Sequence, residues 1–148
     1  MVRLPDASFS FANCARSLVY GAMVTLKLGM DILAGENVRM DSLLGHGGFF
    51  KTPGTAQKLL AGALNTPVSV METAGEGGPW GMALLAAYRV HREKDETLED
   101  YLAHHVFAGA NSVTIEPDAE DVQGFAAYAR RFEEGLSAER AAVSALKV

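Results

Sequence analysis

Residues 43–88 read "LLGHGGFFKTPGTAQKLLAGALNTPVSVMETAGEGGPWGMALLAAY" and repeat one pattern twice. The segment "RMDSLLGHGG" at 39–48 is short and apolar before its glycines, and "TPVSVME" at 66–72 leads into a second glycine-rich turn. After each turn the apolar residues step by three and four, which is typical of an amphipathic helix. Two successive strand–turn–helix units predict an α/β layer whose strands end at one edge, where the two glycine turns meet beside a ligand.

Longer helical patterns flank this stretch. Apolar residues at steps of three and four over 18–33 predict a long helix that Gly35 ends. Downstream, the sequence predicts a charged linker at 93–97, a helix at 98–107, an extended segment at 111–118 and a last helix over 122–136. We expect all 148 residues to form one domain, in which 98–148 is a helical tail.

Composition limits the class of partner. The chain is 49% apolar and 21% charged, as in globular proteins, and its net charge of −5 argues against binding nucleic acid or an anionic membrane. Cys14 is the only cysteine, which excludes an internal disulfide and favours a reducing compartment. No uncharged run reaches the length of a membrane span, and the first residues lack the features of a signal peptide. We therefore expect a cytoplasmic protein with a small-molecule partner.

The first glycine turn partly matches a phosphate-binding P-loop, G-x-x-x-x-G-K-[ST]. Gly45 stands at the first glycine position and Lys51-Thr52 close the motif. Phe50, however, occupies the second glycine position, where the backbone often needs a positive φ. Pro53 removes a backbone N–H where a P-loop helix would offer donors. These two residues argue against a P-loop.

Taken in order, these segments resemble the C-terminal domain of the FGGY carbohydrate kinases, particularly the xylulokinase-like members. Residues 43–88 are similar to the family's strand, glycine-rich adenosine segment, helix, strand and closing helix. The segment "ANCARSLVYGAMVTLKLGMDIL" at 12–33 resembles the preceding long helix, and "VFAGANSVTIEPDAEDVQGFAAYARRFEEGL" at 106–136 resembles the tail. The resemblance implies a partial ribonuclease H-like (actin-like ATPase) α/β lobe, helix-rich with a short sheet.

The resemblance also implies a function: transfer of the γ-phosphoryl group of ATP to a pentulose such as xylulose, with ATP and Mg²⁺ as cofactors. Gly47 and Gly48 would lie beside the adenine and ribose, with Phe49, Lys51 and Thr52 completing the cofactor-binding set. Many members have three successive glycines, a small residue and then lysine. This chain instead has two phenylalanines before Lys51, which makes the loop bulkier.

The family's sugar pocket, its general-base aspartate and further phosphate-binding turns have no counterpart among these residues. We therefore expect part of a kinase, without catalytic residues of its own and inactive alone, whose N-terminal lobe binds the sugar and holds most of the Mg²⁺. Without that lobe, the long first helix and the region near Trp80 would expose apolar surface. Such a surface predicts a two-fold homodimer.

The candidate site residues also have structural interpretations. Gly47 and Gly48 could form an ordinary strand-to-helix turn, and Lys51 could be a solvated side chain rather than a phosphate ligand. Thr52 is interpreted first as the cap of a helix that has Pro53 at its first position.

The residues of the second turn and the histidines also have both functional and structural interpretations. Its glycines, Gly75, Gly77 and Gly78, could admit a ligand or only bring a helix close to a strand. Glu76 fits a helix N-terminus better than a ribose contact, and Trp80 fits packing better than base stacking. His46 could act in the loop or make a strand-end hydrogen bond. His104 and His105 diverge on a helix and predict no metal site.

A rival function belongs to another class of protein. The chain could be a non-catalytic α/β module for binding or assembly, whose glycines serve only the turns. Binding of nucleotide distinguishes the two functions.

Overall fold

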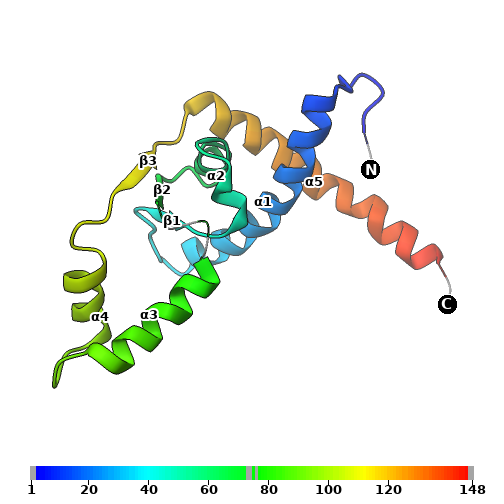
Figure 1. Ribbon diagram of the computed structural model, residues 1–148. Helices are drawn as coiled ribbons and strands as arrows, with labels where there is room; N and C mark the ends of the chain where they lie inside the picture. The colour runs from blue at the N-terminus through cyan, green and yellow to red at the C-terminus, as the bar shows by residue number, and fades with distance from the viewer. Residues whose placement is uncertain (1–2, 73–74, 76, 147–148) are drawn as a thin grey trace. The chain divides into compact units, whose positions relative to one another are not determined.

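The computed structural model describes residues 3–72, 75 and 77–146 (Figure 1). Its elements in chain order are α1 (Phe11–Gly35), β1 (Leu43–Gly45), the 3₁₀-helix η1 (Gly48–Lys51), α2 (Thr55–Leu64), β2 (Val68–Met71), α3 (Gly77–His91), α4 (Leu98–Tyr101), the π-helical segment η3 (Leu102–Val106), β3 (Ser112–Ile115) and α5 (Ala119–Ala145). The chain divides into two compact units, residues 1–40, 59–65 and 117–148, and residues 41–58 and 66–116. The expected helix-rich α/β architecture with a short sheet is confirmed.

The first unit is built around the packing of α1 against α5. The Tyr20 ring meets the Phe125 ring edge-on, with centroids 5.0 Å apart, and both side chains are buried. Tyr128 also packs on Tyr20, and its hydroxyl donates a hydrogen bond to the Ser17 carbonyl at 2.9 Å. Val24 is fully buried beside them. This core follows from the stripe of apolar residues that each helix presents.

Side-chain caps fix where these helices begin. The Ser10 hydroxyl accepts a hydrogen bond from the backbone N–H of Asn13, so α1 begins several residues before its apolar stripe. The Asp118 carboxylate accepts from the N–H groups of Glu120 and Asp121 at the start of α5. Aspartate and serine are favoured caps because they satisfy N–H groups that lack intrahelical partners.

Helix α1 is, by its length and composition, apolar enough to cross a membrane, although only 17% of its most apolar window is buried. Two charged residues, Lys27 and Asp31, form an ion pair within the helix. Buried core helices pass the same test of length and apolarity, so the observation alone does not place α1 in a membrane.

The second unit contains a three-stranded sheet in the order β1-β2-β3. Strand β1 pairs parallel with β2, with Leu43 opposite Val68 and Gly45 opposite Val70. Strand β3 pairs antiparallel with β2, with Ile115 opposite Val68. The parallel pairing brings the carboxyl ends of the first two strands to one edge, as the sequence predicts.

A buried glutamine, Gln57, ties α2 to two strands of the second unit. Its side-chain amide donates to the carbonyl of Val68 at 3.1 Å and to that of Val113 at 2.8 Å. The side chain is only 5% exposed. Its two hydrogen bonds satisfy carbonyl groups on neighbouring strands and offset the cost of burying a polar group.

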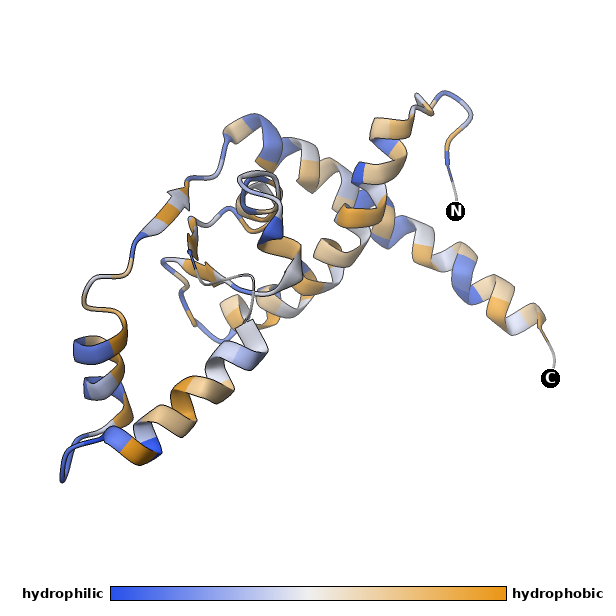
Figure 2. Ribbon diagram, viewed as in Figure 1, coloured by the Kyte–Doolittle hydropathy of each residue, from blue (hydrophilic) through white to orange (hydrophobic). Residues whose placement is uncertain are grey.

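Helix α3 begins at Gly77 and has no buried side chain among its described residues. Trp80 and Tyr88 are half-buried. Met82 and Val90 are 71% and 73% exposed, and Figure 2 shows apolar residues along the helix. The residues that follow α3 form no helix until Thr97, whose hydroxyl accepts from the N–H of Asp100 and caps α4.

Candidate functional site

The candidate site lies at the edge of the sheet where β1 and β2 end. His46 and Gly47 follow β1 directly, and the second glycine turn follows β2. In open α/β sheets, ligands bind outside the carboxyl ends of parallel strands. The structure therefore brings the first glycine loop, which we define as residues 46–52, to a position typical of a ligand site.

Gly47 has a backbone conformation that only glycine adopts without strain. Its φ is 98° and its ψ is −178°, in a region that a Cβ atom excludes. The Gly47 carbonyl then accepts a hydrogen bond from the N–H of Phe50 at 3.1 Å, which closes the turn into η1. The sharp exit from β1 thus depends on Gly47.

Gly48 differs from Gly47 in both backbone and surroundings. It is the first residue of η1, it is exposed, and a Cβ atom added there would have no neighbour within 4 Å among the described residues. Within the part of the chain that the structure describes, no steric demand requires a glycine at this position. Because Gly48 has no side chain, its backbone is accessible, and a flat ligand could approach it closely.

The two glycine turns touch each other through Gly77. A Cβ atom on Gly77 would lie 3.0 Å from His46 Cβ and 3.3 Å from Gly47 N, both tighter than ordinary contacts. The start of α3 therefore approaches the first loop as closely as it does because this residue has no side chain. The predicted meeting of the two turns is observed. His46 is exposed and contributes its backbone and Cβ to this contact.

The side chain of Lys51 lies beside the second glycine turn. A Cβ atom on Gly75 would lie 3.4 Å from Lys51 Cε and 3.5 Å from Lys51 Cγ, so the aliphatic part of the lysine lies close to this glycine. Lys51 as a whole is exposed. This places a positive charge near the edge where both turns converge.

The two phenylalanines of the loop have different environments. Phe50 is half-buried with its ring over Gly45, where a Cβ atom would fall 2.5 Å from ring atoms Cε1 and Cζ. Phe49 meets Phe50 edge-on, with centroids 5.4 Å apart, and remains 46% exposed. Phe50 therefore anchors the loop, whereas Phe49 presents a ring to solvent. The pairing of Gly45 with Phe50 was not predicted from the sequence.

The expectation that Thr52 caps α2 with Pro53 at its first position is wrong. Thr52 ends η1 with extended backbone, and α2 begins at Thr55. Gly54 has a φ of 73°, and the N–H of Thr55 bonds to the Pro53 carbonyl at 2.8 Å. This tight turn separates the two helices, so the α2 start is displaced from the glycine loop.

The sequence-based predictions also concern three residues of the second turn and the start of α3. Glu76 lies outside the described residues. Trp80 is half-buried, and its indole N–H is buried without a hydrogen-bond partner among the residues that the structure describes. Gly78 faces open space.

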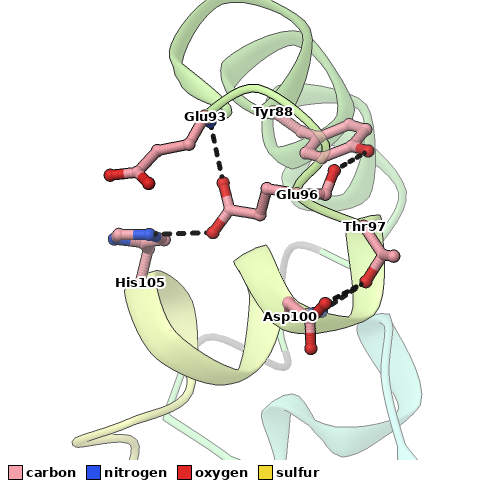
Figure 3. Close-up of polar contacts among 6 residues, drawn as sticks. All are labelled: Tyr88, Glu93, Glu96, Thr97, Asp100 and His105. Carbon is pink, nitrogen blue, oxygen red and sulfur yellow. Dashed lines mark hydrogen bonds and ion pairs between the residues drawn. The ribbon is translucent and has the colours of Figure 1, made fainter.

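A polar cluster in the same unit centres on Glu96 (Figure 3). One carboxylate oxygen lies 3.2 Å from His105 Nε2, and the other accepts from the N–H of Glu93 at 3.0 Å. The Glu96 carbonyl accepts from the Tyr88 hydroxyl at 2.8 Å, and His105 packs against the Tyr101 ring. Both carboxylate oxygens are thus engaged in holding the linker between α3 and α4. This arrangement fixes local structure and offers no nucleophile.

Metal ligands are not gathered anywhere in the described part of the chain, since no group of three or more His, Cys, Asp or Glu side chains lies together there. Cys14 is half-buried on α1.

A scan against protein families matches residues 3–90 to the FGGY family of carbohydrate kinases, C-terminal domain. The match covers more than half of the chain and contains both glycine turns. The chain belongs to the FGGY family of carbohydrate kinases. No curated protein and no solved structure gave a match.

Proposed function

We propose that this FGGY domain binds the ATP of a kinase that phosphorylates a pentulose such as xylulose. One observation carries the proposal: two glycine turns converge at the carboxyl edge of a parallel strand pair, inside the segment that matches a carbohydrate kinase family. The fold we propose for the intact domain is the ribonuclease H-like type of the actin-like ATPases.

The loop suits the adenosine end of a nucleotide. Among the described residues, nothing lies within 4 Å of a Cβ atom added at Gly48, and the exposed Phe49 ring beside it can pack on a flat base. The half-buried Phe50 holds this surface in place through its contact with Gly45. A wrapped P-loop is not needed, because adenine and ribose are recognised by shape and by a few polar contacts.

The phosphates would extend toward Lys51. Its ammonium group can act as a point charge, and the second turn supplies backbone close by at Gly75 and Gly77. Mg²⁺ would neutralise charge on the transferring group. Phosphoryl transfer depends mainly on positioning and electrostatic stabilisation, so one lobe can hold ATP while another lobe presents the sugar hydroxyl and its base.

Calorimetric titration with ATP-Mg²⁺ tests this function. We expect binding by the wild-type chain, and Gly48→Val should weaken the affinity by about tenfold or more, because a branched side chain fills the open space beside the backbone. Gly109→Val is the matched control, since Gly109 also faces open space but lies far along the chain from the loop.

Thermal unfolding of the same variants separates ligand loss from fold loss. Gly48→Val should unfold at the wild-type temperature, because no described residue lies within 4 Å of the added Cβ atom. A wild-type chain that gives no heat at millimolar nucleotide, or a Gly48→Val variant that binds normally, would favour the non-catalytic module instead.

A further inference from the structure

The distal part of α5 together with its C-cap residue Leu146, which we define as residues 132–146, carries a regular apolar seam. Phe132, Leu136, Val143 and Leu146, with Glu139 between them, follow alternating steps of four and three residues. That spacing is the pattern of a helix that packs lengthwise against another helix. Residues 137–146 are all exposed, with Val143 at 70% and Leu146 at 74%. Phe132 and Leu136 are half-buried, so the part of the seam that lacks cover in the described structure is residues 137–146.

The seam continues an interface that already exists. Counting back from Phe132 by the same steps gives Ala129 and Phe125, and Phe125 is buried against Tyr20 of α1. Beside Ala129 lies a cavity of about 270 Å³, with an apolar floor that includes Val24. Charged residues of both signs also line this cavity: Lys27, Asp31, Arg130 and Glu133.

We propose that the distal part of α5 docks antiparallel on the same segment of a second copy of the chain, around a two-fold axis. In the seam register, Phe132 packs on Val143 of the second copy, and Leu136 packs beside the aliphatic part of the second copy's Glu139. Leu146 of the second copy then reaches Ala129, at the wall of the cavity. A two-fold axis makes each contact occur twice, so the surface is complementary to itself.

The charged residues beside the seam favour an antiparallel arrangement of the two helices. Glu133 and Arg140 occupy the same flank of the seam, one heptad apart. In the antiparallel pair, Glu133 faces Arg140 of the second copy, and the symmetry gives two ion pairs. In a parallel pair, these two side chains would face Tyr128 and Gly135, and neither ion pair would form. Electrostatic complementarity of this kind fixes register and orientation.

Analytical ultracentrifugation of the full chain, from micromolar to near-millimolar concentration, tests the dimer. We expect a concentration-dependent rise to twice the mass of the chain. The double variant Val143→Glu/Leu146→Glu should remain monomeric throughout, with an unchanged circular dichroism spectrum, because both side chains are exposed. A wild-type chain that stays monomeric would overturn the proposal, as would a dimer that the double variant retains.

Charge reversal tests the register. Glu133→Arg and Arg140→Glu should each raise the dimer dissociation constant by about tenfold, because every change acts twice across the axis, and the two together should restore it. Glu139→Leu should tighten the dimer by removing a carboxylate from the seam, whereas Glu134→Leu, on the opposite face, should not. Failure of the double reversal to restore binding would exclude this register.

Discussion

The ring of Phe50 lies directly over Gly45, so close that a Cβ atom there would fall 2.5 Å from the ring. Gly45 is buried at the end of β1, and Phe50 is half-buried. The contact fixes the first glycine loop on the sheet edge.

Gly45→Ala should destabilise the protein by about 1–3 kcal/mol, because the methyl group would displace the Phe50 ring from a packed position. Chemical denaturation measures the change in unfolding free energy. Gly109→Ala is the control, because its Cβ atom meets nothing within 4 Å. Equal stability of the two variants would show that the ring moves at no cost.

Gln57→Leu should cost about 1–3 kcal/mol of stability, because the carbonyl groups of Val68 and Val113 would lose a hydrogen-bond donor in a buried setting. Gln123→Leu replaces an exposed glutamine on α5 and should change the unfolding free energy little. A Gln57→Leu variant as stable as the wild type would mean that water satisfies these carbonyl groups.

Burial raises the pKa of the Tyr128 hydroxyl above its ordinary value of 10.0. The unfolded chain therefore loses this proton at lower pH than the folded chain does. The associated stabilisation is complete below about pH 10 and is lost as the pH rises above it.

Tyr128→Phe should abolish the loss of folding stability that this hydroxyl causes at alkaline pH. At neutral pH it should lower the unfolding free energy by about 1 kcal/mol, because the hydrogen bond to Ser17 is lost. Denaturation at neutral pH and at about pH 11 compares the two chains. An identical pH dependence for both would contradict the assignment of this group.

Lys51→Met should weaken ATP binding by about tenfold while leaving adenosine binding unchanged, because the lost ammonium group would contact phosphate and not the base. Titration calorimetry with both ligands measures this difference. A parallel loss of both affinities would instead indicate that Lys51 shapes the loop through its contact with Gly75.

Much of the fold follows from local pattern. The stepping of apolar residues predicts α1 and α5, and the Asn65 that follows α2 has a φ of 50°, a conformation in which asparagine commonly ends a helix. The parallel pairing of β1 and β2 follows from the repeated strand–turn–helix order. These features depend on residues near one another in sequence, which is why periodicity finds them.

The missed features depend on contacts between distant residues. Gln57 joins Val113 across 56 positions, and no local signal marks it as buried. The sequence also does not tell which glycine of the pair has the special backbone conformation, and the structure assigns it to Gly47. The late start of α2 depends on the positive φ of Gly54, which local capping rules do not anticipate.

Nuclear magnetic resonance of the ¹⁵N-labelled chain, titrated with ATP-Mg²⁺, tests the central claim most directly because it locates the ligand. We predict saturable shifts of the amide resonances of Gly47, Gly48, Phe49 and Gly77, with those near Phe125 unchanged. An absence of shifts at millimolar nucleotide, or shifts confined to the cavity beside α5, would contradict a nucleotide site at the two glycine turns.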